Sequence, residues 1–167
     1  MAHLNYLAMT LPFAPFRDVY DQLNERRDVG KLISRGEAHV TVLTPPEFDL
    51  LKAHVSMAEI NQIALDMKIQ ATELKPICLG EGRAVVEGVQ QSTYFIVVQA
   101  EGLFKIRRAI ADLYALRDKR AGLNPELVFH ADHFYPHVTI GFTRLDLFEQ
   151  QGVIKDDRSC VDALDTR

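Results

Sequence analysis

Two short segments of the chain repeat a histidine and a threonine at the same spacing. His39-Val40-Thr41-Val42 and His137-Val138-Thr139-Ile140 share the order histidine, apolar, threonine, apolar, and lie 98 residues apart. An imidazole can take up or release a proton near neutral pH, and a hydroxyl can bind an anionic oxygen. Two such pairs at one point would suit phosphodiester cleavage, with one histidine as general base and the other as general acid. The threonines would then bind the non-bridging oxygens.

Both tetrads lie in stretches that predict β-strands. The first stretch, residues 37–44, is rich in β-branched residues and ends at Pro45-Pro46, and the second covers residues 135–142. Side chains at positions i and i+2 of a strand point to the same face, about 6.5–7 Å apart. Each strand therefore presents its histidine and threonine on one side and two apolar residues on the other. The four polar groups can act together only if the two strands lie close to each other.

The rest of the chain predicts an α+β fold with short elements. The pattern indicates strands at residues 4–11, 83–89 and 94–98, with the last one covered on both faces. It indicates helices at residues 15–27, at 47–67 in one or two pieces, and from residue 103 to Gly122, and an extended segment at 69–79. Gly80-Glu81-Gly82 predicts a turn and Asn124-Pro125 a loop, whereas the acidic tail at about 146–167 is weakly patterned.

Paired His-x-Thr-x motifs, one in each half of a chain of this length, resemble the 2H phosphoesterase superfamily. The resemblance extends from about Leu4 to Phe142, and its specific part is the two tetrads. It implies a bilobal α+β fold with pseudo-two-fold symmetry, in which two antiparallel sheets face a central cleft and the helices lie outside. Residues 1–167 would form this single bilobal domain. Cleavage of 2′,3′-cyclic phosphates at RNA ends or in small cyclic nucleotides, without a cofactor, is the implied activity.

The same resemblance assigns roles to individual residues. His39 and His137 match the acid–base pair, and Thr41 and Thr139 match the phosphate ligands. The sequence does not decide which histidine is the base; we prefer His137 as the base that activates water and His39 as the acid. The residues around the first tetrad are also similar to a subgroup linked with RNA repair.

Three further side chains are candidates for substrate binding. Tyr135 precedes His137 by two residues and would share its face of the strand, where it could stack on a base or ribose. Arg35 and Arg83 could contact the phosphate. Packing in the core or exposure on the surface is the competing interpretation for each of them.

Two other functions compete with a two-histidine enzyme. His130, His133 and His137 have His-x2-His-x3-His spacing, which can suit zinc, so a zinc hydrolase is one alternative. The segment contains Pro136 and predicts a loop leading into a strand, so the three side chains would not share a helix face. The other alternative is a non-catalytic module that binds a nucleotide or an RNA end. We prefer the enzyme, with no metal and no cofactor.

Composition limits the partners and the location. The net charge of −4 argues against a protein that binds long duplex nucleic acid. Residues 102–122, however, carry six basic side chains and two acidic ones. These would form either a solvated helix face or a patch that attracts phosphate. No apolar run is long enough for a membrane span, and the N-terminus lacks the pattern of a signal peptide. With Cys78 and Cys160 expected to be free thiols, we predict a cytoplasmic protein, with the nucleus as the alternative.

Overall fold

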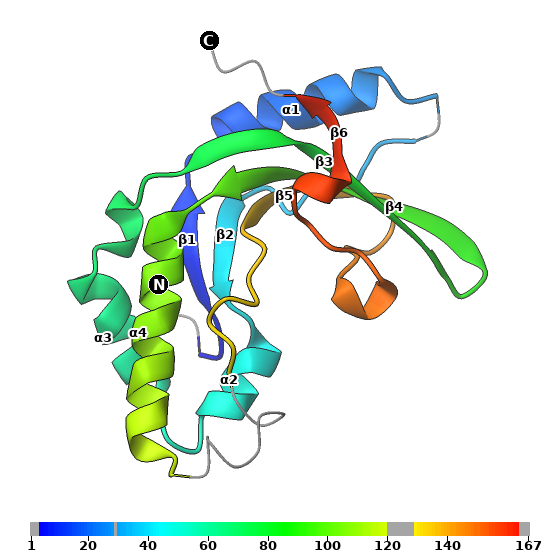
Figure 1. Ribbon diagram of the computed structural model, residues 1–167. Coiled ribbons are helices and arrows are strands. Elements are labelled where there is room, and N and C mark those ends of the chain that lie inside the picture. Colours follow the sequence, from blue (N-terminus) through cyan, green and yellow to red (C-terminus); the bar gives the residue numbers. More distant parts are fainter. Residues whose placement is uncertain (1–3, 29, 120–128, 164–167) are drawn as a thin grey trace. The chain divides into compact units, whose positions relative to one another are not determined.

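The computed structural model describes residues 4–28, 30–119 and 129–163 and shows an α+β fold (Figure 1). Its strands are β1 (Leu7–Leu11), β2 (Ala38–Leu43), β3 (Lys75–Val86), β4 (Val89–Gln99), β5 (His137–Phe142) and β6 (Cys160–Ala163). The α-helices are α1 (Ala14–Glu25), α2 (Pro45–Leu51), α3 (Met57–Asp66) and α4 (Glu101–Arg117), and the short 3-10 helices are η1 (Ile69–Ala71), η3 (Glu149–Gln151) and η4 (Asp157–Ser159). The predicted ends at Gly122 and Asn124-Pro125 lie outside the described residues.

The strands form one six-stranded sheet, in the order β1-β2-β5-β4-β3-β6. The pairings of β2 with β5, β5 with β4, β4 with β3 and β3 with β6 are antiparallel. The expectation of two separate sheets is therefore wrong for the described residues. The reason is that β2 pairs directly with β5, with Val40 opposite Val138, so the strands of the two tetrads belong to one ladder. The central cleft beside the tetrads stays a prediction.

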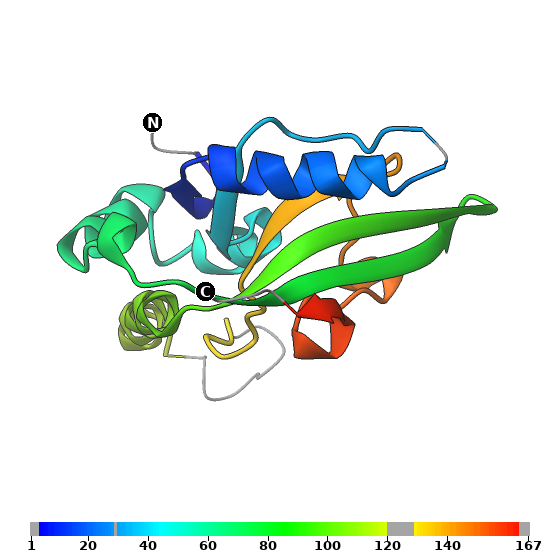
Figure 2. The ribbon, with the colours of Figure 1, turned by 90° about the horizontal axis from the view of Figure 1, so that it is seen from above.

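The chain divides into two compact units. The first unit consists of residues 1–9, 41–73 and 100–134, and the second of residues 10–40, 74–99 and 135–167. In the second unit, α1 covers one face of the sheet and the segment around η4 lies on the other (Figure 2). The core on the η4 side contains Cys78, Phe95, Val97, Leu147 and Val153. This unit contains both histidines of the tetrads.

A buried arginine organises the first unit. Arg107 of α4 is fully buried, and its guanidinium forms an ion pair of 2.7 Å with Glu47 of α2. It also donates to the carbonyl oxygens of Val42, His130, Ala131 and His133. Five charge-assisted contacts compensate for removing this cation from water. Arg107 therefore connects the end of β2 and the segment at residues 130–133 to α4, and it is not part of a solvated basic face. Arg120, from the same basic stretch, lies outside the described residues.

The β2 strand ends in a helix cap. Oγ1 of Thr44 accepts a hydrogen bond from the Glu47 backbone N–H at 3.3 Å, and the Glu47 carboxylate accepts one from the Thr44 N–H at 3.1 Å. This capping box satisfies free backbone donors of the first helical turn. Because α2 begins at Pro45, the strand that carries His39 and Thr41 has a defined end only a few residues later.

β3 is one long strand, so the predicted turn at residues 80–82 is wrong. Its two glycines are explained by close packing on one face of the sheet. A Cβ atom at Gly80 would collide with the ring of Phe95, and one at Gly82 would collide with Val153. Glycine is therefore selected here because nothing larger fits.

Cys78 and Cys160 form a disulfide, which contradicts the expectation of free thiols. Because β6 pairs with β3, Cys160 lies next to Cys78 although 82 residues separate them. The inference of a reducing compartment from free cysteines therefore loses its basis, and the cytoplasmic or nuclear location stays a prediction. None of the described helices combines the length and the apolar character that a membrane crossing needs.

Candidate active site

The pairing of β2 with β5 places residues of the two tetrads side by side. Val40 and Val138 lie opposite each other and are fully buried. Side chains alternate along a strand, so His39 and Thr139 project from the opposite face, and the antiparallel register places them opposite each other. His39 and His137 are close enough for the charge of one to affect the other. The structure therefore brings His39, His137 and Thr139 together on one face of the second unit.

Thr41 follows His39 by two residues in β2 and so projects from the same face of that strand. The boundary between the two compact units falls between Val40 and Thr41, so His39 is assigned to the second unit and Thr41 to the first. Its predicted role as a phosphate ligand stays a prediction.

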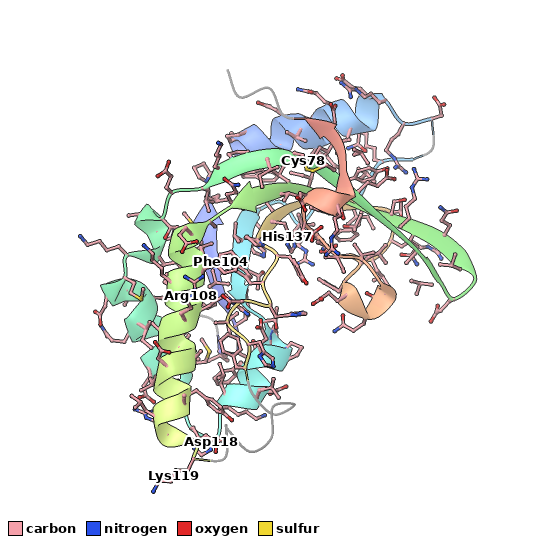
Figure 3. The ribbon with its side chains drawn as sticks, in the orientation of Figure 1. Cys78, Phe104, Arg108, Asp118, Lys119 and His137 are labelled. Carbon is pink, nitrogen blue, oxygen red and sulfur yellow. A yellow bond between two sulfur atoms is a disulfide. The ribbon has the colours of Figure 1, made fainter. Side chains whose placement is uncertain are left out.

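His137 is the first residue of β5 (Figure 3), and its hydrogen bonding defines which ring nitrogen carries the proton. Its Nδ1 lies 2.7 Å from the carbonyl oxygen of Tyr135. A carbonyl oxygen only accepts, so Nδ1 carries the proton of this bond and the neutral ring has its lone pair on Nε2. Burial lowers the pKa of His137 to about 3, and the nearby Lys155 ammonium and His39 act in the same direction. The Tyr135 carbonyl and Asp146 oppose this shift without cancelling it. His137 is therefore neutral at pH 7, which is the form that a general base requires.

His39 has a different environment. Its Nδ1 lies 3.4 Å from Oε1 of Glu37, whose side chain is exposed. A carboxylate at this distance orients the ring and stabilises an imidazolium. The two histidines are thus unequal: burial keeps His137 neutral, whereas an exposed carboxylate lies beside His39.

Asp146 connects the threonine of the second tetrad to two cations. Its carboxylate accepts hydrogen bonds from Oγ1 of Thr139 at 3.3 Å and from Oγ1 of Thr93 at 2.7 Å. It also accepts from Arg35 at 3.1 Å and from Nζ of Lys155 at 2.9 Å. Burial raises the pKa of the Asp146 carboxyl, but Lys155, Thr93 and Arg35 outweigh burial and lower that pKa overall. Asp146 is therefore ionised and held in one orientation at the centre of a polar cluster.

The sequence analysis missed Asp146 and Lys155. Both lie in the acidic tail, where no motif or periodicity marks them. Lys155 is 3% exposed, and only the packing of the tail on the sheet reveals this burial. No local signal could have distinguished the two residues from their charged neighbours.

The structure separates the two arginines predicted to bind phosphate. Arg35 reaches the Asp146 cluster. Arg83 lies 2.8 Å from Glu81, opposite Ser92 in the β3–β4 register. Gly82 and its partner Thr93 belong to the face of Asp146, so Arg83 projects from the other face of the sheet. Arg83 is therefore not brought to the histidines.

Tyr135 contributes its backbone to the site through the bond to His137, and its side chain is partly buried. The stacking role of its ring stays a prediction. His130 and His133 belong to the first unit, where Arg107 holds their carbonyl oxygens at 3.0 Å. Within residues 4–28, 30–119 and 129–163, no three His, Cys, Asp or Glu side chains gather as a metal site. The zinc alternative therefore has no geometric support.

Two unequal histidines and a threonine hydroxyl on neighbouring strands are the groups that the two-histidine phosphoesterase class would need. A comparison with family models supports this class independently. The model for the Swiss Army Knife 2H phosphoesterase domain matches residues 5–148, which is most of the chain. The chain therefore belongs to the 2H phosphoesterase family. Comparisons with curated proteins and with solved structures found no significant match.

Proposed function

We propose that the protein is a metal-independent phosphodiesterase that cleaves 2′,3′-cyclic phosphates at RNA ends or in small cyclic nucleotides. Family membership implies a hydrolase of the phosphodiesterase type. The observation that carries the finer proposal is the asymmetry between a neutral His137 and a carboxylate-paired His39. Acid–base cleavage of a phosphodiester requires these two opposite protonation states at the same time.

In the proposed reaction, Nε2 of His137 takes a proton from water, and the water oxygen attacks phosphorus in line with the departing ribose oxygen. A P–O bond to water forms while the P–O bond to the ribose breaks. His39 donates its proton to the ribose oxygen, which leaves a phosphomonoester and a free hydroxyl. Each histidine ends in the protonation state of the other, and exchange with solvent resets the pair.

The low pKa of His137 belongs to the site without substrate. A bound phosphodiester brings a negative charge next to the ring, and an opposite charge favours the imidazolium. The pKa of His137 therefore rises when the substrate binds, toward the range in which a general base works well. Thr139 and Thr41 are proposed to bind the non-bridging oxygens, and Arg35 the phosphate charge. The substrate is a nucleotide or an RNA terminus, as in RNA processing or repair.

The test is turnover of the four 2′,3′-cyclic nucleotide monophosphates by protein treated with a chelator, with products separated by chromatography. Wild-type protein should turn over, and His39→Ala and His137→Ala should each lose about 10²–10⁴-fold in rate. His130→Ala is the matched control, because it removes an imidazole that belongs to neither tetrad, and it should keep wild-type turnover.

Three results would contradict the proposal. Activity that returns only with added zinc and is lost in His130→Ala would establish the zinc hydrolase. Tight nucleotide binding without turnover would establish a binding module. Equal activity of His39→Ala, His137→Ala and the wild type would show that the tetrads do not carry the chemistry.

A further inference from the structure

A buried lysine lies next to the site but outside the domain that defines the family. The family model ends at residue 148, whereas Lys155 follows it by seven residues. Lys155 is 3% exposed, and the segment around it is fastened to β3 by the disulfide between Cys78 and Cys160. A fully desolvated ammonium is costly, so a lysine in this position needs a specific partner.

The partner of Lys155 is Asp146. The Lys155 Nζ donates to Oδ1 of Asp146 at 2.9 Å, and both side chains are 4% exposed. The ammonium also lies 4.8 Å from the ring centre of Phe148 and 5.6 Å from that of Phe95, so aromatic faces cover it. A buried pair enclosed in this way is fixed in geometry, because breaking it would leave two unpaired charges away from water.

Asp146 in turn fixes the orientation of Thr139 and Arg35, the two groups proposed to bind the phosphate. Its Oδ2 accepts from Thr139 and from Arg35, and its Oδ1 accepts from Thr93 and Lys155. Without the lysine, Asp146 and Arg35 would neutralise each other and the cluster would carry no net charge. With the lysine, the three charges sum to +1 beside the threonine of the second tetrad, which suits an anionic substrate.

We propose that Lys155 is a positioning residue of the active site: through its buried ion pair with Asp146 it orients Thr139 and Arg35 for the phosphate and keeps the His137 side of the site positively charged. The proposal deepens the proposed function and rests on it. Through Asp146, it gives the segment beyond the family domain an indirect part in the reaction.

The charged groups that face His137 make this proposal measurable. They are Lys155 and Asp146 from the tail segment and His39 from β2. The Lys155 cation disfavours a second positive charge on His137, whereas the Asp146 anion favours it. Removing the cation alone leaves the anion, so the imidazolium of His137 becomes easier to form.

The experiment follows the His137 ring by NMR in histidine-labelled protein, with the signal assigned by its absence in His137→Ala. In Lys155→Met, the titration midpoint of His137 should rise by about one pH unit or more relative to the wild type. The acid limb of the kcat/KM profile should move upward by the same amount. Lys52→Met is the matched control, because it removes an exposed lysine paired with Asp49 at 2.8 Å and should move neither quantity.

A folded Lys155→Met variant with the wild-type His137 titration would overturn the proposal. Should Lys155→Met not fold, the double variant Asp146→Asn/Lys155→Met decides, because it leaves no unpaired buried charge. Its kcat/KM should fall by about tenfold or more, since Thr139 and Arg35 lose their charged common acceptor. Wild-type kcat/KM in the double variant would also overturn the proposal. If the wild type turns over none of the cyclic nucleotides, the proposed function fails, while the His137 titration still decides the role of Lys155.

Discussion

The Nδ1 of His137 donates to the carbonyl oxygen of Tyr135, two residues earlier, across 2.7 Å. This bond to the backbone just before β5 fixes the tautomer of the ring. It leaves Nε2 as the proton acceptor and favours His137 as the general base. The preference for His137 as base, which the sequence could not decide, thereby gains a physical argument.

The low pKa of His137 makes the protein less stable in acid. The unfolded chain binds a proton on this residue near pH 6.5, and the folded chain does so only near 3. Between these values the unfolded state holds more protons, so the free energy of unfolding falls as the pH falls. Urea titrations measure the free energy of unfolding at pH 7 and at about pH 4.5. Between these pH values it should fall by about 2 kcal/mol more in the wild type than in His137→Gln. An identical loss in both proteins would show that His137 titrates normally.

Variants of Arg35 and Arg83 form a matched pair that tests where the substrate binds. Arg35 lies 3.1 Å from Asp146, whereas Arg83 projects from the other face of the sheet and pairs with Glu81. Arg35→Met should raise the KM for a cyclic nucleotide by about tenfold, the cost of one hydrogen bond to a charged group. Arg83→Met should leave KM unchanged. A larger effect at Arg83 would contradict the placement of the site.

Arg107 should contribute strongly to stability. Its guanidinium is buried and bonds to Glu47 and to four carbonyl oxygens, and it stacks on Phe129 and Phe134. Arg107→Met should lower the free energy of unfolding by about 3–5 kcal/mol, because it leaves a carboxylate and several carbonyls unpaired. Arg108→Met on the same helix removes a half-exposed arginine and should cost far less. Equal costs in denaturant titrations would refute this assignment.

The disulfide between Cys78 and Cys160 should stabilise the tail. Peptide mapping without reductant should recover the two cysteine peptides joined, and reduction should lower the free energy of unfolding by about 2–5 kcal/mol. Cys78→Ala/Cys160→Ala is the control, and its stability should not respond to reductant. Two separate cysteine peptides under oxidising conditions would contradict the bond.

Local patterns were enough to predict several elements of the fold. The strands of both tetrads, the buried strand at residues 94–98 and the helix that begins near residue 103 are all confirmed. These elements are encoded by spacing over a few residues, which is the range on which side-chain periodicity acts. The turn predicted at residues 80–82 is wrong. Gly80 and Gly82 resemble a turn in the sequence, but in the structure they make room for the side chains of Phe95 and Val153.

The sequence by itself determined the pair of tetrads and therefore the class of chemistry, because each tetrad is a local motif on a strand. Only the tertiary structure decided which groups surround that motif. Asp146, Lys155 and the Cys78–Cys160 bond depend on the tail packing against β3 and β4. The neutrality of His137 depends on desolvation and on charges brought from distant parts of the chain. Such effects follow from distances in space, and no spacing along the sequence encodes them.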